Sequence, residues 1–217
     1  MEKVEKVLSY YMLCNKLKDL IRKGWVDWNV KKERIESVAE HVYGTQQLAI
    51  AMWSEYQYDI DIKKVIVMLA VHELEETVIG DLTPFQITKE EKDELGHKAV
   101  HDILSKLNLG ESFEDIILEF DERKTPEAKF AFFCDKLECD LQCKLYDEMY
   151  YVDLEFQENN PVSKHPRVKR LIEEGKSWSE MWMEHDRETY KFDEAFNEVS
   201  EYAEKHDLYE LKKIKTR

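Results

Sequence analysis

The sequence predicts an all-α protein, and three observations support this fold class. Only six glycines and four prolines occur among 217 residues, so few positions would interrupt a helix. Apolar residues recur at helical spacing along most of the chain. Hydrophobic residues make up 43% of the sequence, enough for a folded chain with a core rather than a disordered one. We therefore expect one large helical domain.

The first elements are predicted from apolar spacing and capping signals. A helix from Val4 to Arg22 would carry one apolar stripe. Residues 23 to 35 are predicted to form a loop. Ser37, with Glu40 three residues later, matches a capping box, so a helix is expected to begin there and to run to about residue 56. The stripe of the first helix consists of Val4, Leu8, Tyr11, Met12 and Leu17.

The middle of the chain repeats the same signals. Asp61 would open a helix that ends at Gly80, because glycine commonly follows a helix C-terminus. Thr88 and Glu91 match a second capping box. Pro126 suits the first turn of a long helix. The helices expected after residue 61 cover residues 61–79, 88–107, 112–120 and 126–151.

The domain organisation is read from the last strong break in the chain. Asn159-Asn160-Pro161 is predicted to end the helical core. Residues 1–160 would form the main domain, and residues 161–217 a helical extension packed on it. Aromatic residues in this extension, such as Trp178 and Tyr190, are expected to serve packing or contacts between subunits.

The charge of the chain excludes some classes of partner. The formal net charge is −15, which argues against non-specific binding of nucleic acid or anionic membranes. A small phosphorylated substrate stays possible, because a metal ion and a few local cations can override the global field. No apolar run approaches the length of a membrane span, and residues 1–6 lack the apolar segment of a signal peptide. A cytoplasmic location is expected.

A scattered set of imidazole and carboxylate side chains predicts a metal site. His72 and Glu73 are adjacent after an apolar run, His41 lies well upstream and Asp135 well downstream. Mixed nitrogen and oxygen ligands suit a catalytic divalent ion with open positions. If the helix of residues 61–79 is continuous, Glu76 shares a face with His72 and can point into the same pocket. Glu75, at the neighbouring helical spacing, is an alternative.

At these residues the sequence resembles the HD-domain metal-dependent phosphohydrolases, and more closely the branch that contains the 5′-deoxynucleotidases. The resemblance spans about residues 8 to 150 and rests on four blocks in order. The blocks are Gly24-Trp25-Val26 with Glu36-Ser37-Val38-Ala39-Glu40-His41, then His72-Glu73-Leu74-Glu75-Glu76 through Ile79-Gly80-Asp81-Leu82-Thr83-Pro84, then Lys89-Glu90-Glu91-Lys92, and last Glu127-Ala128-Lys129-Phe130 with Asp135-Lys136-Leu137-Glu138.

The resemblance implies an HD-domain helical bundle and a role for each site residue. One divalent transition metal (Co, Mn, Fe, Ni or Zn) would be ligated by four side chains. Glu76 would position or deprotonate the attacking water, and Asp81 would contact the sugar or help hold the site. The implied ligands are His41, His72, Glu73 and Asp135.

Two positions depart from the family pattern. Residue 73 is Glu where the family has Asp, and the side chain is one methylene longer. Trp28 stands where relatives often carry an arginine that grips phosphate, so Arg34 is the predicted substitute cation. The substrate-binding residues expected from the sequence are therefore Trp28, Arg34 and Asp81.

The function implied by the resemblance is hydrolysis of the phosphomonoester of (deoxy)nucleoside 5′-monophosphates. A homodimer is also implied. Two alternatives stay open. One is a degenerate HD protein that binds a nucleotide or a partner without hydrolysis. The other is a different HD phosphodiesterase or nucleotide hydrolase.

Overall fold

The regular structure of the chain is helical, as the sequence predicted. The computed structural model describes residues 2–83, 86–157 and 160–211. Within these ranges no strand occurs, and the only extended pairing is an antiparallel bridge between Ile21 and Ser37. Pro84 and Asn159, which the sequence analysis used, lie outside the described residues. None of the described helices has the length and apolar character needed to cross a membrane.

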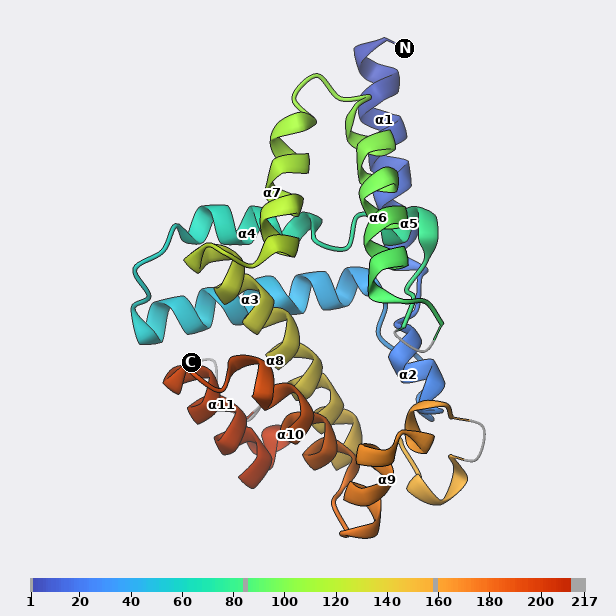
Figure 1. Cartoon of the computed structure of the whole chain (residues 1–217), viewed down its shortest axis with the longest axis vertical. Coiled ribbons are helices and arrows are strands. Elements are labelled where there is room, and N and C mark those ends of the chain that lie inside the picture. The colour runs from blue at the N-terminus through green and yellow to red at the C-terminus, as the bar shows by residue number, and fades with distance from the viewer. Residues whose placement is uncertain (1, 84–85, 158–159, 212–217) are drawn as a thin grey trace. The chain divides into compact units, whose positions relative to one another are not determined.

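The chain order of the helices can be followed in Figure 1. The helices are α1 (Lys3–Cys14), α2 (Lys23–Asp27), α3 (Val38–Tyr56), α4 (Ile62–Val71), α5 (Glu76–Ile79), α6 (Lys89–Leu104), α7 (Glu111–Glu122), α8 (Pro126–Glu148), α9 (Pro166–Glu173), α10 (Trp178–Tyr190), α11 (Glu194–Lys205) and α12 (Leu208–Leu211). Short 3₁₀ turns are η1 (Asn15–Lys18), η2 (Leu154–Phe156) and η3 (Val162–Lys164).

Spatial proximity divides the chain into two compact units. The first contains Met1–Trp25 and Ile35–Cys134, and the second contains Val26–Arg34 and Asp135–Arg217. The division passes along α8, so both units share one continuous helix. The predicted boundary at residue 160 stays a prediction.

The first unit is organised by capped helices that pack in pairs. Both predicted capping boxes form: the Ser37 hydroxyl accepts from the Glu40 amide, and the Thr88 hydroxyl accepts from the Glu91 amide. Asp61 caps α4 in the same way. α3 lies beside α4, and α6 beside α7 (Figure 1). The helices that carry the candidate site therefore begin at residues readable from the sequence.

Three element boundaries differ from the prediction. α1 ends at Cys14 rather than Arg22, because η1 and then the Ile21–Ser37 bridge draw the chain out of helical geometry. The predicted loop after residue 22 contains α2. α4 ends at Val71, so the helix expected to continue to Gly80 is interrupted by a turn before α5.

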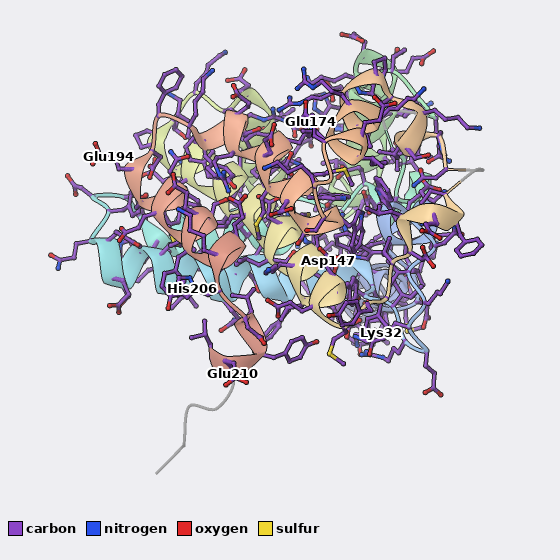
Figure 2. The ribbon with its side chains drawn as sticks, turned by 90° about the horizontal axis from the view of Figure 1, so that it is seen from below. Lys32, Asp147, Glu174, Glu194, His206 and Glu210 are labelled. Carbon is purple, nitrogen blue, oxygen red and sulfur yellow. The ribbon has the colours of Figure 1, made fainter. Side chains whose placement is uncertain are left out.

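The second unit holds α10 against α8 through two polar anchors, of which only the Tyr190–Asp140 pair is buried. The backbone amide and hydroxyl of Ser179 both donate to Asp147, at 2.9 and 2.6 Å. The Tyr190 hydroxyl donates to Asp140 at 2.7 Å. Asp147 lies on α8 in Figure 2. Trp178, Tyr190 and Phe196 are buried, as expected of packing residues.

The Asp140 anchor predicts a pH-dependent stability. Burial and then the negative charge of Asp186 raise the pKa of Asp140 well above its usual range, while the Tyr190 hydrogen bond, Lys136 and Arg187 lower it. In the unfolded chain the pKa is about 3.9. The folded state therefore holds the proton more tightly, and this stabilisation is lost as the pH rises from about 4 through the folded pKa.

In an Asp140→Asn variant, folding stability should not fall in this way as the pH rises. The amide oxygen of asparagine still accepts the hydrogen bond from Tyr190 and carries no charge. We expect parent and variant to be similarly stable near pH 4 and the variant to be the more stable at pH 7. Urea unfolding at both pH values measures the difference. Parallel pH profiles would contradict the expectation.

Candidate metal centre

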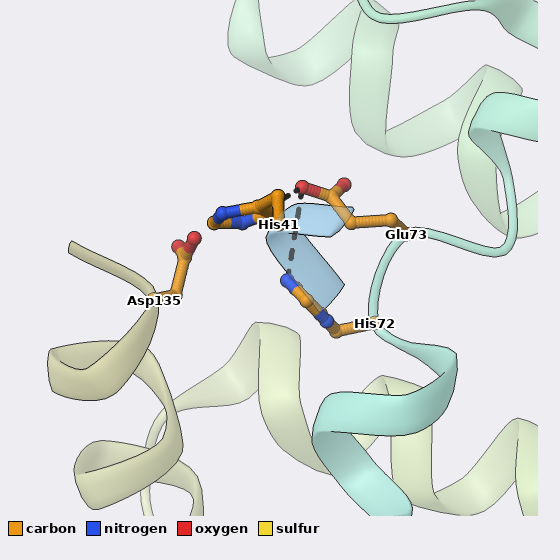
Figure 3. A group of neighbouring side chains, drawn as sticks. All are labelled: His41, His72, Glu73 and Asp135. Atoms are coloured by element: carbon orange, nitrogen blue, oxygen red, sulfur yellow. Dashed lines mark ion pairs between the residues drawn. The ribbon is translucent and has the colours of Figure 1, made fainter. Parts of the chain in front are cut away.

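The four predicted ligands lie together. One donor atom from each of the four side chains is within 4.8 Å of the donor atoms of the other three, and all four residues are buried. Figure 3 shows them converging from three segments. His41 stands on the first turn of α3, His72 and Glu73 on the turn after α4, and Asp135 in α8.

The two imidazoles face the same carboxylate oxygen. Nε2 of His41 and Nε2 of His72 are each 3.7 Å from Oε1 of Glu73. Nδ1 of His72 lies 2.8 Å from the carbonyl oxygen of Leu69. This contact favours the tautomer that is protonated at Nδ1 and directs the lone pair of Nε2 toward Glu73. The dashed lines in Figure 3 mark both imidazole–carboxylate pairs.

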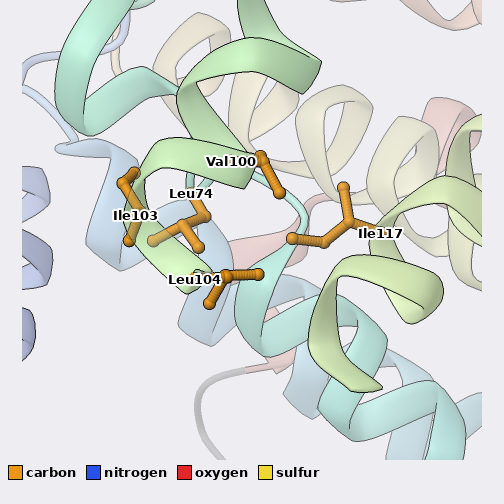
Figure 4. Close-up of a cluster of buried hydrophobic side chains, with 5 residues drawn as sticks. All are labelled: Leu74, Val100, Ile103, Leu104 and Ile117. Atoms are coloured by element: carbon orange, nitrogen blue, oxygen red, sulfur yellow. The ribbon is translucent and has the colours of Figure 1, made fainter. Parts of the chain in front are cut away.

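The turn that carries His72 and Glu73 is anchored by their neighbour Leu74. Leu74 packs with Val100 and Ile103 of α6 and with Ile117 of α7 (Figure 4). Its amide donates to the Val71 carbonyl at 3.0 Å, a tighter turn than an α-helix makes. Burial of Leu74 accompanies the break after α4. His72 and Glu76 are therefore not on one continuous helix face, and the helical argument for Glu76 was wrong.

The donor set fits one divalent ion. Imidazole nitrogens and carboxylate oxygens bind such ions at about 2.0–2.2 Å, so two ligands of one ion lie at most about 4.4 Å apart. The 3.7 Å separations between the histidine nitrogens and Glu73 are within that limit. Two nitrogens and two carboxylates suit Mn, Fe, Co, Ni or Zn. His41, His72, Glu73 and Asp135 would hold the ion.

The structure adds a cation that the sequence analysis missed. Arg22 Nη1 lies 3.2 Å from Glu73 Oε1 and 4.0 Å from Asp81 Oδ2. The Ile21–Ser37 bridge brings this arginine to the start of α3, which carries His41. Arg22 stands two residues before the Gly24-Trp25 block in the sequence, but a one-residue bridge has no periodic pattern that would predict its position.

Glu76 is buried among charged neighbours. Its Oε1 lies 3.6 Å from Lys92 Nζ of α6. Burial, followed by the negative charges of Glu73 and Asp81, raises the pKa of Glu76 to about 10. Arg22 and Lys92 act in the opposite direction. The net effect keeps Glu76 protonated near neutral pH, so it could accept a proton only if a further positive charge, such as a bound metal ion, lowered its pKa.

Glu75, the alternative to Glu76, points to a different neighbour. A β-carbon placed on Gly96 of α6 would lie 3.3 Å from its Cγ. Glycine at position 96 therefore makes room for the Glu75 side chain. Burial, and then the charge of Glu73, raise the pKa of Glu75 to about 8. The charges that act on Glu76 include Arg22 and Asp81, whereas those that act on Glu75 include Asp121 of α7, so Glu76 is the better candidate acceptor.

The remaining predicted residues occupy three different settings. Asp81 accepts a hydrogen bond from the Lys23 amide at 2.7 Å, which ties the segment after α5 to the residue that follows Arg22. Trp28 is 2% exposed, and its ring centroid lies 5.8 Å from that of Trp178 in the second unit. Arg34 is exposed. The substrate-binding roles of Asp81, Trp28 and Arg34 stay predictions.

Comparison with known families decides the class of protein. Residues 14–176 match the HD domain family. The chain belongs to the HD domain family. Among solved structures, this HD domain is similar in fold to a predicted metal-dependent phosphohydrolase from Magnetospirillum magnetotacticum MS-1, with a TM-score of 0.60 and 20% identity over 93% of this chain and 94% of that one.

Curated relatives of this HD domain protein are named as nucleotidases. The 5′-deoxynucleotidase HDDC2 of Dictyostelium discoideum is 36% identical over 149 residues, which cover 65% of this chain and 77% of the relative. The 5′-deoxynucleotidase hdd1 of Schizosaccharomyces pombe is 30% identical over 173 residues, 75% of this chain and 85% of the relative. The family predicted from the sequence blocks is confirmed.

Proposed function

We propose that this HD domain protein is a metal-dependent phosphohydrolase that releases phosphate from deoxynucleoside 5′-monophosphates. The observation that carries the proposal is the buried group of two imidazoles and two carboxylates within 4.8 Å of one another. The curated relatives, named 5′-deoxynucleotidases, support the substrate class.

The phosphate would be bound by Arg22. Its guanidinium already lies among carboxylates of the site, 3.2 Å from Glu73. A planar guanidinium matches the geometry of two phosphate oxygens, so it can hold the group and balance negative charge that develops on it. Asp81 would keep the Arg22–Lys23 segment in place through its bond to the Lys23 amide.

The attacking water would lose its proton to Glu76. This carboxylate is 3% exposed, and a general base needs to be shielded and within reach of the reacting water. A divalent ion held by His41, His72, Glu73 and Asp135 would supply Lewis-acid chemistry and a lowered pKa for a bound water. Lys92, next to Glu76, favours the ionised form, and the charge of the bound ion would have to lower the pKa of Glu76 further before this carboxylate could accept a proton.

The direct test is phosphate release from matched nucleotides. Purified protein, stripped of metal, would be assayed with a deoxynucleoside 5′-monophosphate, its ribonucleotide and its 3′-monophosphate isomer, each with Co²⁺, Mn²⁺ or Zn²⁺. We expect release that requires metal and is fastest with the deoxynucleoside 5′-monophosphate. No release in any metal would refute hydrolysis of these compounds.

The alternative function is binding without hydrolysis, and Glu73 in place of the family's Asp motivates it. The same samples distinguish the two functions. A deoxynucleotide that raises the thermal midpoint of the metal-loaded protein, with no phosphate released, would favour a binding protein. A cytoplasmic location stays a prediction.

We also propose a homodimer, formed through α1. Five apolar side chains of this helix are more than half exposed, and they lie on one face at helical spacing. α1 contains two lysines and one glutamate, so it is not acidic like the chain as a whole, in which net negative charge opposes self-association. The five side chains are Val4, Val7, Leu8, Tyr11 and Met12.

A Leu8→Asp, Tyr11→Asp double variant is expected to convert the dimer into a monomer. Phe192→Asp is the matched control, because Phe192 is 93% exposed and lies outside α1. Light scattering after size exclusion measures the mass of each protein. A monomeric parent, or a double variant that remains dimeric, would contradict the proposal.

A further inference from the structure

Two buried residues of the first sequence block, Trp25 and Glu36, are joined by a side-chain hydrogen bond. Nε1 of the Trp25 indole donates to Oε2 of Glu36 at 2.7 Å. Both residues are buried. A buried carboxylate needs hydrogen-bond donors, and an indole N–H can only donate, so the two groups satisfy each other.

The same two residues hold the backbone of Arg22 from both sides. The Arg22 amide donates to the Glu36 carbonyl at 3.1 Å, and the Trp25 amide donates to the Arg22 carbonyl at 3.2 Å. Together with the indole–carboxylate bond, these contacts close a ring of three hydrogen bonds. The ring uses the side chains of Trp25 and Glu36 but only the main chain of Arg22.

The ring lies where the segment of Arg22 meets the start of α3. On the other side of the Ile21–Ser37 bridge, the Val38 amide donates to the Leu20 carbonyl at 2.8 Å. In the described part of the chain this bridge is not continued into a strand, so no longer ladder holds its register. A side-chain bond between the two segments therefore helps to fix Arg22 relative to the helix that carries His41.

The guanidinium reaches the centre from this anchored position. Arg22 Nη1 lies 3.2 Å from Oε1 of Glu73. An arginine holds a phosphate through two parallel hydrogen bonds only when the plane of its guanidinium is set correctly. A displacement of about 1 Å in a group that positions substrate can cost about 10²-fold in rate, so the anchoring of the Arg22 backbone matters for the reaction.

We propose that Trp25 and Glu36 are positioning residues for Arg22, and that their indole–carboxylate bond sets the phosphate affinity of the site. This inference rests on the proposed function, in which Arg22 binds the phosphate. It gives the two residues a role that they perform through the main chain of Arg22.

The test is a double-mutant cycle on phosphate binding, with inorganic phosphate as the probe and the Co²⁺-loaded protein as the sample. Dissociation constants would be measured by titration calorimetry for the parent, Trp25→Phe, Arg22→Met and the double variant. Trp25→Phe keeps an aromatic ring but loses the indole donor, and we expect it to weaken phosphate binding by about 10-fold. In the Arg22→Met background the same change should have no further effect, because no guanidinium is left to misplace.

Acceptor variants at Glu36 test the same bond from its other side. Glu36→Gln keeps an oxygen that can accept from the indole and should retain most of the phosphate affinity. Glu36→Met removes the acceptor and should match Trp25→Phe. This pair of variants carries the comparison if circular dichroism shows that Trp25→Phe does not fold.

Two controls separate positioning from a general loss of structure. The Co²⁺ dissociation constant should be unchanged in Trp25→Phe, since all four predicted metal ligands are kept. Trp53→Phe is the matched control for the tryptophan change, because Trp53 is an exposed residue of α3, and it should leave phosphate binding unchanged.

The outcomes separate this inference from the proposed function. A Co²⁺-loaded parent that binds no phosphate, or binds it equally well after Arg22→Met, would overturn the role of Arg22 and this inference with it. Phosphate binding like that of the parent in folded Trp25→Phe and Glu36→Met would overturn the positioning role alone. Equal losses with and without Arg22 would show that the pair does not act through this arginine.

Discussion

Replacement of His72 by alanine is expected to remove both the bound metal and the phosphohydrolase activity. His72 Nε2 faces Glu73 at 3.7 Å, and its other nitrogen is fixed by the Leu69 carbonyl. Metal ions supply several kcal/mol of transition-state stabilisation, so we expect kcat/KM to fall by about 10³-fold or more. Elemental analysis of the purified variant should show the metal content fall well below that of the parent.

The expected loss is local rather than a failure to fold. His72 contacts the ring of Phe120 edge-on, so the variant also creates a small cavity. His72→Gln, which keeps more of the side-chain volume, serves as the second variant. Circular dichroism would report the helical content of both. Full activity in a folded, metal-depleted His72 variant would rule out a metal-dependent reaction.

Replacement of Arg22 by methionine is expected to give the opposite combination: metal retained and turnover lost. Removal of a preorganised charge that faces the reacting group costs about 10²- to 10³-fold. The guanidinium is not one of the predicted ligands, and its loss leaves Glu73 Oε1 without one competing cation at 3.2 Å. Metal affinity should therefore be unchanged or higher, while kcat/KM falls by about 10²-fold.

Inhibition by inorganic phosphate gives an independent measure of the same residue. Phosphate should inhibit the parent more strongly than Arg22→Met, with Arg22→Lys intermediate, because lysine offers a point charge in place of a fork. Arg34→Met is the matched control, since the sequence predicted Arg34 as the phosphate-binding cation and the structure places it in an exposed position. A larger effect at Arg34 than at Arg22 would reverse this assignment.

The helix starts and the ligand residues of the candidate site could be predicted from the sequence. The capping boxes at Ser37 and Thr88 were readable because a cap depends on residues three apart. The four predicted ligands were found by residue type and order, and the fold brings their donor atoms within 4.8 Å.

What the sequence could not predict depends on contacts between distant segments. The break after Val71 follows the burial of Leu74 against α6 and α7. The position of Arg22 follows the pairing of Ile21 with Ser37. Neither contact leaves a periodic signal in the segment that it reshapes, so a continuous helix was predicted in both places.

The position of Glu73 Oε1 has a consequence for the order in which the site assembles. This one oxygen faces His41 Nε2, His72 Nε2 and Arg22 Nη1. A metal ion bound there would take over the negative charge that holds Arg22, and would free the guanidinium for an incoming anion. The Arg22 guanidinium would then stay paired with Glu73 until the metal ion is bound, and only afterwards could it bind an anion.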